Sequence, residues 1–194
     1  MSNKKTDHPK GSKKLIGAWA LYDWANSVYS LVISSAIFPI YYSQYVFSQT
    51  NSVEILNLDI NKDTLISSVS ALSFLLIAFL SPLLSGIADF IGNKKIFMKF
   101  FVYMGSFSCI GLYWFELETI EISLLFYTLG LIGFWGSLVY YNSYLTDITY
   151  PNQTNKVSAK GYTMGYIGSV ILLLINLIMI NFYETFGFES EIAA

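Results

Sequence analysis

Long uncharged runs alternate with short polar stretches along this 194-residue chain. No charged residue occurs between Trp24 and Val53, or between Thr64 and Ala88. A helix needs about 20 apolar residues to cross the hydrocarbon layer of a bilayer. The pattern therefore predicts an all-α integral membrane protein with a bundle at 15–183, whose five spans lie at about 15–47, 64–88, 96–115, 122–146 and 161–183.

One acidic residue, Asp23, lies inside the first predicted span. A carboxylate at the bilayer centre costs roughly 2.5–3.5 kcal/mol on insertion scales, so it is expected to face a bundle interior or a water-filled path. At about 100° per residue, Asn26, Ser27 and Ser30 lie within roughly 60° of the direction of Asp23. This polar stripe predicts a path for a solute or a proton. In the alternative interpretation, the same side chains hydrogen-bond neighbouring helices and hold the bundle together.

The lysines predict the orientation of the spans. If the amino end lies in the cytoplasm, the cytoplasmic side holds Lys4, Lys5, Lys10, Lys13, Lys14, Lys94, Lys95, Lys99, Lys156 and Lys160, and only Lys62 lies outside. Such an excess of lysine is typical of cytoplasmic loops. We therefore expect residues 1–14 to form a cytoplasmic tail and the protein to lie in a bacterial inner membrane. Residues 184–194 would form an external tail of a chain that is truncated before a sixth span.

Composition excludes several classes of function. Charged residues make up 12% of the chain, about half the share usual in soluble domains. A net charge of −2 without a basic face argues against a nucleic-acid partner. The single histidine, His8, and the single cysteine, Cys109, leave no basis for a histidine metal site, a catalytic triad or an intrachain disulfide. We expect no metal, no cofactor and no enzyme activity.

A second polar stripe is predicted on the fourth span. Tyr140, Tyr141 and Tyr144 share one helix face with Gly130 and Gly133, and we assign the three tyrosines to the pathway together with Asp23. The glycines themselves, like the G-x-x-x-G pair Gly161 and Gly165 of the fifth span, are interpreted as sites where helices pack closely.

The turn SGIADFIGNKK between the second and third spans resembles the signature loop of the major facilitator superfamily, G-x-x-x-D-[RK]-x-G-[RK]-[RK]. It matches at Asp89, Gly92 and Lys94, whereas Ser85, Phe90 and Asn93 depart from the pattern. The resemblance implies a cytoplasmic gate, which we assign to Asp89, Gly92, Lys94 and Lys95. A solvated turn with a lysine pair that sets the topology is the alternative.

Two further stretches resemble the vacuole-effluxer-like branch of that superfamily, which is named for an autophagy-related vacuolar amino-acid effluxer. They are WALYDWANSVYSLVISSAIFPIYY, at 19–42, and NSYLTDITYPNQTNKVSAKGYTMGYIGS, at 142–169. In the second stretch Thr146 and Lys156 replace the proline and the arginine of the branch. The fold of the family has two six-helix halves, of which this chain would cover five spans of the first. Asp147, at the end of the fourth span, is either a second gate acid paired to a lysine or a solvated helix end.

The resemblance implies a secondary transporter that moves amino acids or similar small polar solutes outward by alternating access, with possible coupling to protons. Its partners would be the solute, the lipid bilayer and the missing second half. The alternative is a membrane fragment or scaffold that does not transport, because half of a two-lobed transporter has no second lobe to move against.

Overall fold

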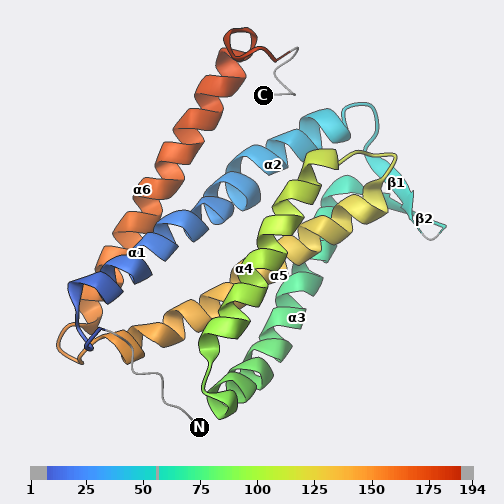
Figure 1. Ribbon diagram of the computed structural model, residues 1–194. Helices are drawn as coiled ribbons and strands as arrows, with labels where there is room; N and C mark the ends of the chain where they lie inside the picture. The colour runs from blue at the N-terminus through green and yellow to red at the C-terminus, as the bar shows by residue number, and fades with distance from the viewer. Residues whose placement is uncertain (1–7, 56, 189–194) are drawn as a thin grey trace. The chain divides into compact units, whose positions relative to one another are not determined.

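The computed structural model describes residues 8–55 and 57–188, and most of them are helical (Figure 1). The outer parts of the two predicted tails, 1–7 and 189–194, lie outside the described residues. The chain folds as two compact units, unit 1 (1–39 and 143–194) and unit 2 (40–142). In chain order the elements are α1 (Lys13–Val28), η1 (Tyr29–Ala36), α2 (Ile37–Ile40), η2 (Tyr41–Val46), β1 (Ser52–Ile55), β2 (Leu58–Asn61), α3 (Lys62–Ile91), α4 (Lys94–Gly111), η3 (Leu112–Trp114), α5 (Ile120–Ile148), α6 (Thr154–Asn181) and η4 (Tyr183–Phe186).

Four helices in the described part of the chain are long and apolar enough to cross a membrane: α3, α4 with its 3-10 extension, α5 and α6. They contain the four later predicted spans almost entirely, and most of them extend further. The largest extension is in α6, which begins at Thr154 rather than near residue 161. Hydropathy marks the length of helix that lies in hydrocarbon, whereas a helix can continue into the polar headgroup region, so the sequence underestimates such ends.

The first predicted span is helical from Lys13 to Val46, but its turns alternate between α- and π-helical. In η1 the hydroxyl of Ser35 donates to the carbonyl oxygen of Ser30, five residues earlier, at 2.9 Å. Pro39, which lacks an N–H group, follows within α2. Wide turns inside α-helices are frequent at functional sites. Because the helix is interrupted, it is not one of the four long helices, and its role as a fifth span stays a prediction.

Defined caps close several helix ends. Ser12 precedes α1, and its hydroxyl accepts from the backbone N–H of Leu15 at 3.3 Å. The side chain of Asn61 caps α3 by accepting from the N–H of Asp63 at 2.9 Å. At the other end of α3, Gly92 has a φ of +68° and its N–H donates to the carbonyl of Ala88 at 3.0 Å. Glycine adopts this left-handed conformation without steric cost, so it permits the reversal into α4.

The predicted loop at 48–63 contains a β-hairpin, which the sequence pattern did not indicate. Strands β1 and β2 pair antiparallel, with Ser52 opposite Asn61 and Ile55 opposite Leu58. Asn57 lies at the reversal with a φ of 62°, a conformation that asparagine tolerates better than most residues. Strands of four residues are too short to show a periodic pattern, so this element is visible only in the structure.

Unit 1 is built on α1 and α6, which pack side by side in the same direction (Figure 1). Just before α1, the N–H of Gly11 donates to the carbonyl of Ile148, the last residue of α5, at 2.7 Å. Gly11 has a φ of +79°, and a Cβ atom there would lie 3.0 Å from both Gln153 and Tyr150. Glycine thus fits both the backbone conformation and the space between α1 and the α5–α6 turn.

Unit 2 is built on α3, α4 and most of α5 (Figure 1). Helices α4 and α5 cross at Gly105 and Gly133, where a Cβ on Gly133 would lie only 2.6 Å from the backbone of Gly105. At the hairpin end of the unit, the hydroxyl of Tyr41 donates to the carbonyl of Phe115 at 2.8 Å. The hydroxyl of Tyr42 donates to the carbonyl of Lys62 at 2.7 Å. These two bonds fix the end of the first helix to the start of α3 and to the α4–α5 connection.

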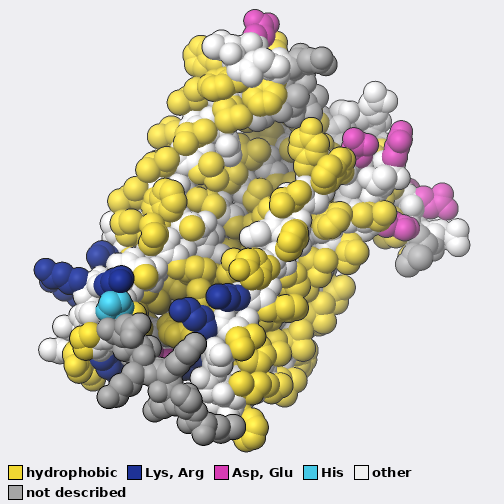
Figure 2. Space-filling view, viewed as in Figure 1, with side chains coloured by type: hydrophobic (Ala, Val, Ile, Leu, Met, Phe, Trp, Pro, Cys, Tyr) yellow, Lys and Arg dark blue, Asp and Glu magenta, His cyan; other side chains and the backbone are white. Residues whose placement is uncertain are grey.

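Large apolar side chains cover the outer surface of the helices (Figure 2). Phe79, Phe90 and Phe107 are 70%, 94% and 70% exposed, respectively. Soluble monomers rarely expose contiguous apolar surface on this scale, whereas helices in lipid do so along their length. Figure 2 also shows acidic side chains gathered at the β1–β2 end of unit 2.

Candidate functional site

The carboxyl group of Asp23 lies inside unit 1 rather than on its surface. Asp23 is 5% exposed and shares the buried face of α1 with Trp19 and Ala20. One helical turn later, the hydroxyl of Ser27 donates to Oδ1 of Asp23 at 3.1 Å. The structure thus brings together two of the predicted pathway residues by direct contact. Burial of an ionisable side chain in an apolar helix pair marks it as a functional candidate.

The opposite wall of this site is glycine-lined. A Cβ atom on Gly165 of α6 would lie 2.6 Å from Oγ of Ser27 and 3.2 Å from Oδ2 of Asp23. Three residues later, a Cβ on Gly168 would overlap the backbone oxygen of Trp24. Close helix packing at the Gly161–Gly165 pair, as interpreted from the sequence, is confirmed at Gly165. The carboxyl group of Asp23 is therefore enclosed between α1 and α6.

The rest of the predicted stripe on the first helix is only partly assembled. The side-chain nitrogen of Asn26 is buried, and the described residues provide no hydrogen-bond acceptor for it. Ser30 lies on an exposed part of η1, and its backbone oxygen accepts the bond from Ser35. The stripe was derived with the period of an α-helix, whereas the π-helical turns from Tyr29 change that period. The shared direction of Asp23 and Ser30 stays a prediction.

The three predicted tyrosines of α5 fall in both units. Tyr140 and Tyr141 are 2% and 4% exposed and belong to unit 2, whereas Tyr144 is partly exposed and belongs to unit 1. The ring of Tyr140 stacks on Phe97 and Phe101, with centroids 5.7 and 6.0 Å away. Together with Ala88 these residues form a hydrophobic cluster. Tyr140 thus has a packing role in unit 2, and a role for the tyrosines in a solute path stays a prediction.

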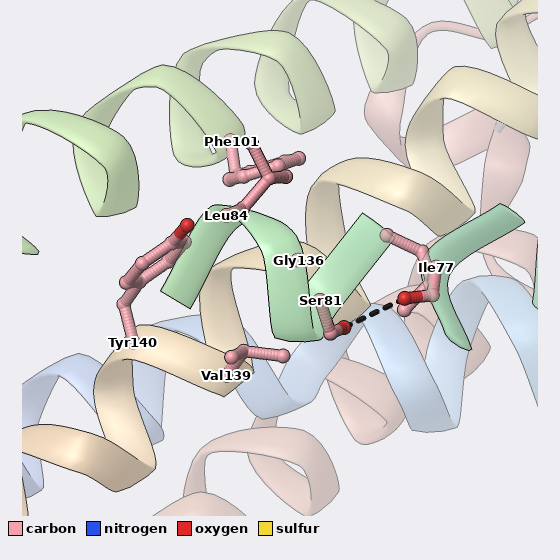
Figure 3. Close-up of a pocket in the computed structure, with 7 residues that line it drawn as sticks. All are labelled: Ile77, Ser81, Leu84, Phe101, Gly136, Val139 and Tyr140. Carbon is pink, nitrogen blue, oxygen red and sulfur yellow. Dashed lines mark hydrogen bonds between the residues drawn. The ribbon is translucent and has the colours of Figure 1, made fainter. Parts of the chain in front are cut away.

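A narrow cleft in unit 2 lies beside this cluster (Figure 3). Its lining residues are Ile77, Ser81, Leu84, Phe101, Gly136, Val139 and Tyr140. The hydroxyl of Ser81 donates to the carbonyl of Ile77 at 2.7 Å, within its own helix (Figure 3). The cleft has no room for a water-sized sphere, and its lining is mostly apolar.

The predicted gate residues lie at the turn between α3 and α4 and at the end of α5. Lys94 and Asp89 form an ion pair, with Nζ 3.4 Å from Oδ1. Asp89 lies in the last turn of α3 rather than in the loop, and Lys94 and Lys95 begin α4. Asp147 lies near the end of α5 and is exposed. The ion pair spans the turn at Gly92, and the role of these residues in gating stays a prediction.

Metal ligation was also considered at these positions. Within 8–55 and 57–188, no group of three or more His, Cys, Asp or Glu side chains is placed to hold a metal ion. The candidate site is therefore a single carboxyl group with a hydroxyl donor and a glycine wall. Such a group can exchange a proton or bind a polar or cationic group.

Sequence reasoning missed two features of the site's surroundings. The first is the π-helical character of η1, directly after the turn that holds Asp23 and Ser27. The second is the pair of tyrosine bonds from Tyr41 and Tyr42 to backbone carbonyls of unit 2. A tyrosine pair near a span end is a weak signal for such anchoring, whereas π-helical turns leave no reliable signal in a single sequence.

Comparison with known proteins identifies the family of the chain. The sequence model described as "Vacuole effluxer Atg22 like" matches residues 11–193. A curated relative, the uncharacterised MFS-type transporter YxiO of Bacillus subtilis (strain 168), is 39% identical over 163 residues, which make up 84% of this chain and 37% of the relative. No solved structure matches the chain significantly. With its four long apolar helices, the protein is a multi-pass integral membrane protein, and it belongs to the vacuole-effluxer-like family of major-facilitator-type proteins.

Proposed function

We propose that the chain is part of a secondary transporter that moves small polar solutes, of the amino-acid class, across a membrane by alternating access. The family match and the name of the curated relative as an MFS-type transporter support this proposal. The observation that carries it is the burial of Asp23 between two apolar helices. A buried acid is costly in a bilayer, so its presence is accounted for by a role in binding or coupling.

In this proposal Asp23 is the site of proton or solute coupling, and Ser27 holds its carboxyl group by a hydrogen bond. Asn26 and the tyrosines of α5 supply further hydrogen bonds to the solute. The direction is outward, as the resemblance to an effluxer implies. Residues 1–194 supply one lobe, and the remainder of the transporter supplies the other, since the chain covers 37% of the length of the relative.

The charges of each unit support an amino end in the cytoplasm of a bacterial cell. In unit 1, exposed lysines lie where α1 and α6 begin: Lys10, Lys13, Lys14, Lys156 and Lys160. In unit 2, Lys94, Lys95 and Lys99 lie at the α3–α4 turn, whereas Glu54, Asp59 and Glu116 lie at the hairpin end. Lysine-rich ends are typical of the cytoplasmic side.

Replacement of Asp23 by asparagine tests the function. In the complete transporter, reconstituted in liposomes with an imposed pH gradient, we expect Asp23→Asn to abolish coupled solute transport while membrane insertion is unchanged. The same change at exposed Asp63, in the first turn of α3, is the matched control and should transport normally. Unchanged transport and pH dependence in Asp23→Asn would remove Asp23 from the mechanism.

The alternative is a membrane fragment that does not transport by itself. It is favoured for residues 1–194 taken alone, because the chain covers so little of its relative. We expect liposomes with residues 1–194 to show no counterflow, and liposomes with the complete transporter to show it. Counterflow by residues 1–194 would contradict the two-lobe proposal.

A further inference from the structure

Gly165 touches both oxygen-bearing groups of the candidate site on α1. Its would-be Cβ lies 2.6 Å from Oγ of Ser27, 3.1 Å from Cβ of Ser27 and 3.2 Å from Oδ2 of Asp23. Any side chain at this position would therefore press first on the serine hydroxyl, which is the donor to Oδ1 of Asp23 at 3.1 Å. The two carboxyl oxygens differ in their contacts on this side: Oδ1 accepts from Ser27, and Oδ2 lies 3.2 Å from the place that a Cβ on Gly165 would take.

The backbone of α6 does not itself require glycine at this position. Gly165 lies inside a regular α-helix and has no positive φ. Glycine in a helix interior is less favourable than alanine. The reason for glycine must therefore lie in what it faces, and it faces the Ser27–Asp23 pair. Gly168, by contrast, faces the backbone and ring of Trp24, which is packing alone.

We propose that Gly165 is a positioning residue for the carboxyl group of Asp23: by leaving space for the hydroxyl of Ser27, it keeps that hydroxyl bonded to the carboxyl group and holds the group against α6. The inference rests on the proposed role of Asp23 in coupling, but its geometry belongs to unit 1 alone. A Cβ at residue 165 displaces the hydroxyl of Ser27, and the carboxyl group then turns away from α6.

Chemical labelling of Asp23 tests the proposal without a transport assay. The chain is reconstituted in phosphatidylcholine liposomes and treated with dicyclohexylcarbodiimide, an apolar reagent that modifies carboxyl groups inside membranes. The modified fraction of the peptide that contains Asp23 is measured by mass spectrometry. We expect Gly165→Ala to raise the labelling rate roughly tenfold, the factor that corresponds to loss of about 1.4 kcal/mol of hydrogen bonding.

Two further variants make the test specific. Ser27→Ala removes the same hydrogen bond without adding atoms to α6, so it should raise labelling by the same factor. In the double variant the further effect of Gly165→Ala should be much smaller than in the unaltered chain, because only the contacts of its Cβ with Cβ of residue 27 and Oδ2 of Asp23 remain. Gly17→Ala is the matched control, because a Cβ on Gly17 meets nothing within 4 Å. Labelling of Gly165→Ala at the rate of the unaltered chain, or an additive effect in the double variant, would overturn the proposal.

A combined variant covers the case in which Gly165→Ala fails to insert. Gly165→Ala with Ser27→Gly restores the space at the contact without restoring the hydrogen bond, so it should insert and be labelled like Ser27→Ala. If this combined variant fails to insert, the Cβ at residue 165 clashes with a group other than Ser27, and the proposal is overturned. If labelling behaves as expected while Asp23→Asn transports normally, the positioning role holds and the proposed coupling role fails.

Discussion

Glycines make close helix contacts in both units, but the groups that they contact differ. In unit 2, Gly133 of α5 lies against Gly105 of α4, so two backbones approach each other with no side chain between them. In unit 1, Gly165 of α6 lies against the polar side chains of Ser27 and Asp23. The same residue type thus supports pure packing in one unit and an enclosed carboxyl group in the other.

The difference shows what a small residue in a membrane helix contributes. Where the neighbour is backbone, added volume can be relieved only if the helices separate. Where the neighbour is the hydroxyl end of a serine, the side chain can rotate, and the loss falls mainly on its hydrogen bond. The first contact therefore controls the stability of unit 2, whereas the second controls the placement of Asp23.

The largest effect is expected at the backbone contact. In Gly133→Ala the new Cβ would lie 2.6 Å from the Cα and N of Gly105 and 2.8 Å from the carbonyl oxygen of Phe101. Neither group can move independently of its helix, so we expect a loss of about 3 kcal/mol in the free energy of unfolding. Thermal unfolding of the purified chain in detergent would measure it.

Gly86→Ala is the control for this prediction, because a Cβ on Gly86 of α3 meets nothing within 4 Å. Its stability should change by less than about 0.5 kcal/mol. Equal effects of the two substitutions would show that the α4–α5 contact does not hold unit 2 together.

An intermediate loss of stability is expected at the polar contact. Gly165→Ala displaces the hydroxyl of Ser27, which can rotate away, and the loss is that of one hydrogen bond to a carboxyl group, about 1.5 kcal/mol. The same unfolding experiment measures it beside Gly133→Ala. A loss as large as that of Gly133→Ala would mean that the two contacts are equally rigid, and the distinction between the units would fail.

The smallest loss of stability is expected when Asp89 is replaced. The side chain of Asp89 is 65% exposed in its ion pair with Lys94, and exposed pairs contribute little because water and salt screen them. Asp89→Asn should lower the free energy of unfolding by about 0.5 kcal/mol or less. A loss above that of Gly165→Ala would show that the α3–α4 turn, rather than the buried face of α1, holds the more important acid.

The sequence was sufficient for the features that depend on long apolar runs. It predicted the four long helices, the burial of Asp23 and the close packing at Gly165, because each follows from the cost of polar groups in lipid or from the size of a side chain. It could not predict the hairpin at 52–61, whose strands are too short to show a period. It also could not place Tyr140, since a tyrosine suits a solute path and an aromatic cluster equally well.

The polar stripe on the first helix shows the limit of predicting side-chain directions from the period of an α-helix. Asp23 and Ser27 both lie within α1, where the period of an α-helix applies, and the structure adds a hydrogen bond between them. From Tyr29 the turns are π-helical, so an angular calculation based on an α-helix no longer applies to the later residues of the stripe. A hydrophobic pattern does not report whether a turn closes as a π- or an α-helical turn.

The wide turns at Tyr29–Ala36 also bear on how the chain can change in length. A π-helical turn closes over one more residue than an α-helical turn. Deletion of one residue there lets the segment close as an ordinary α-helix, and the flanking residues keep their directions. The same deletion in α3 would rotate every later side chain of that helix by about 100°. Insertions and deletions among relatives should therefore be tolerated in this part of the first helix and excluded from α3.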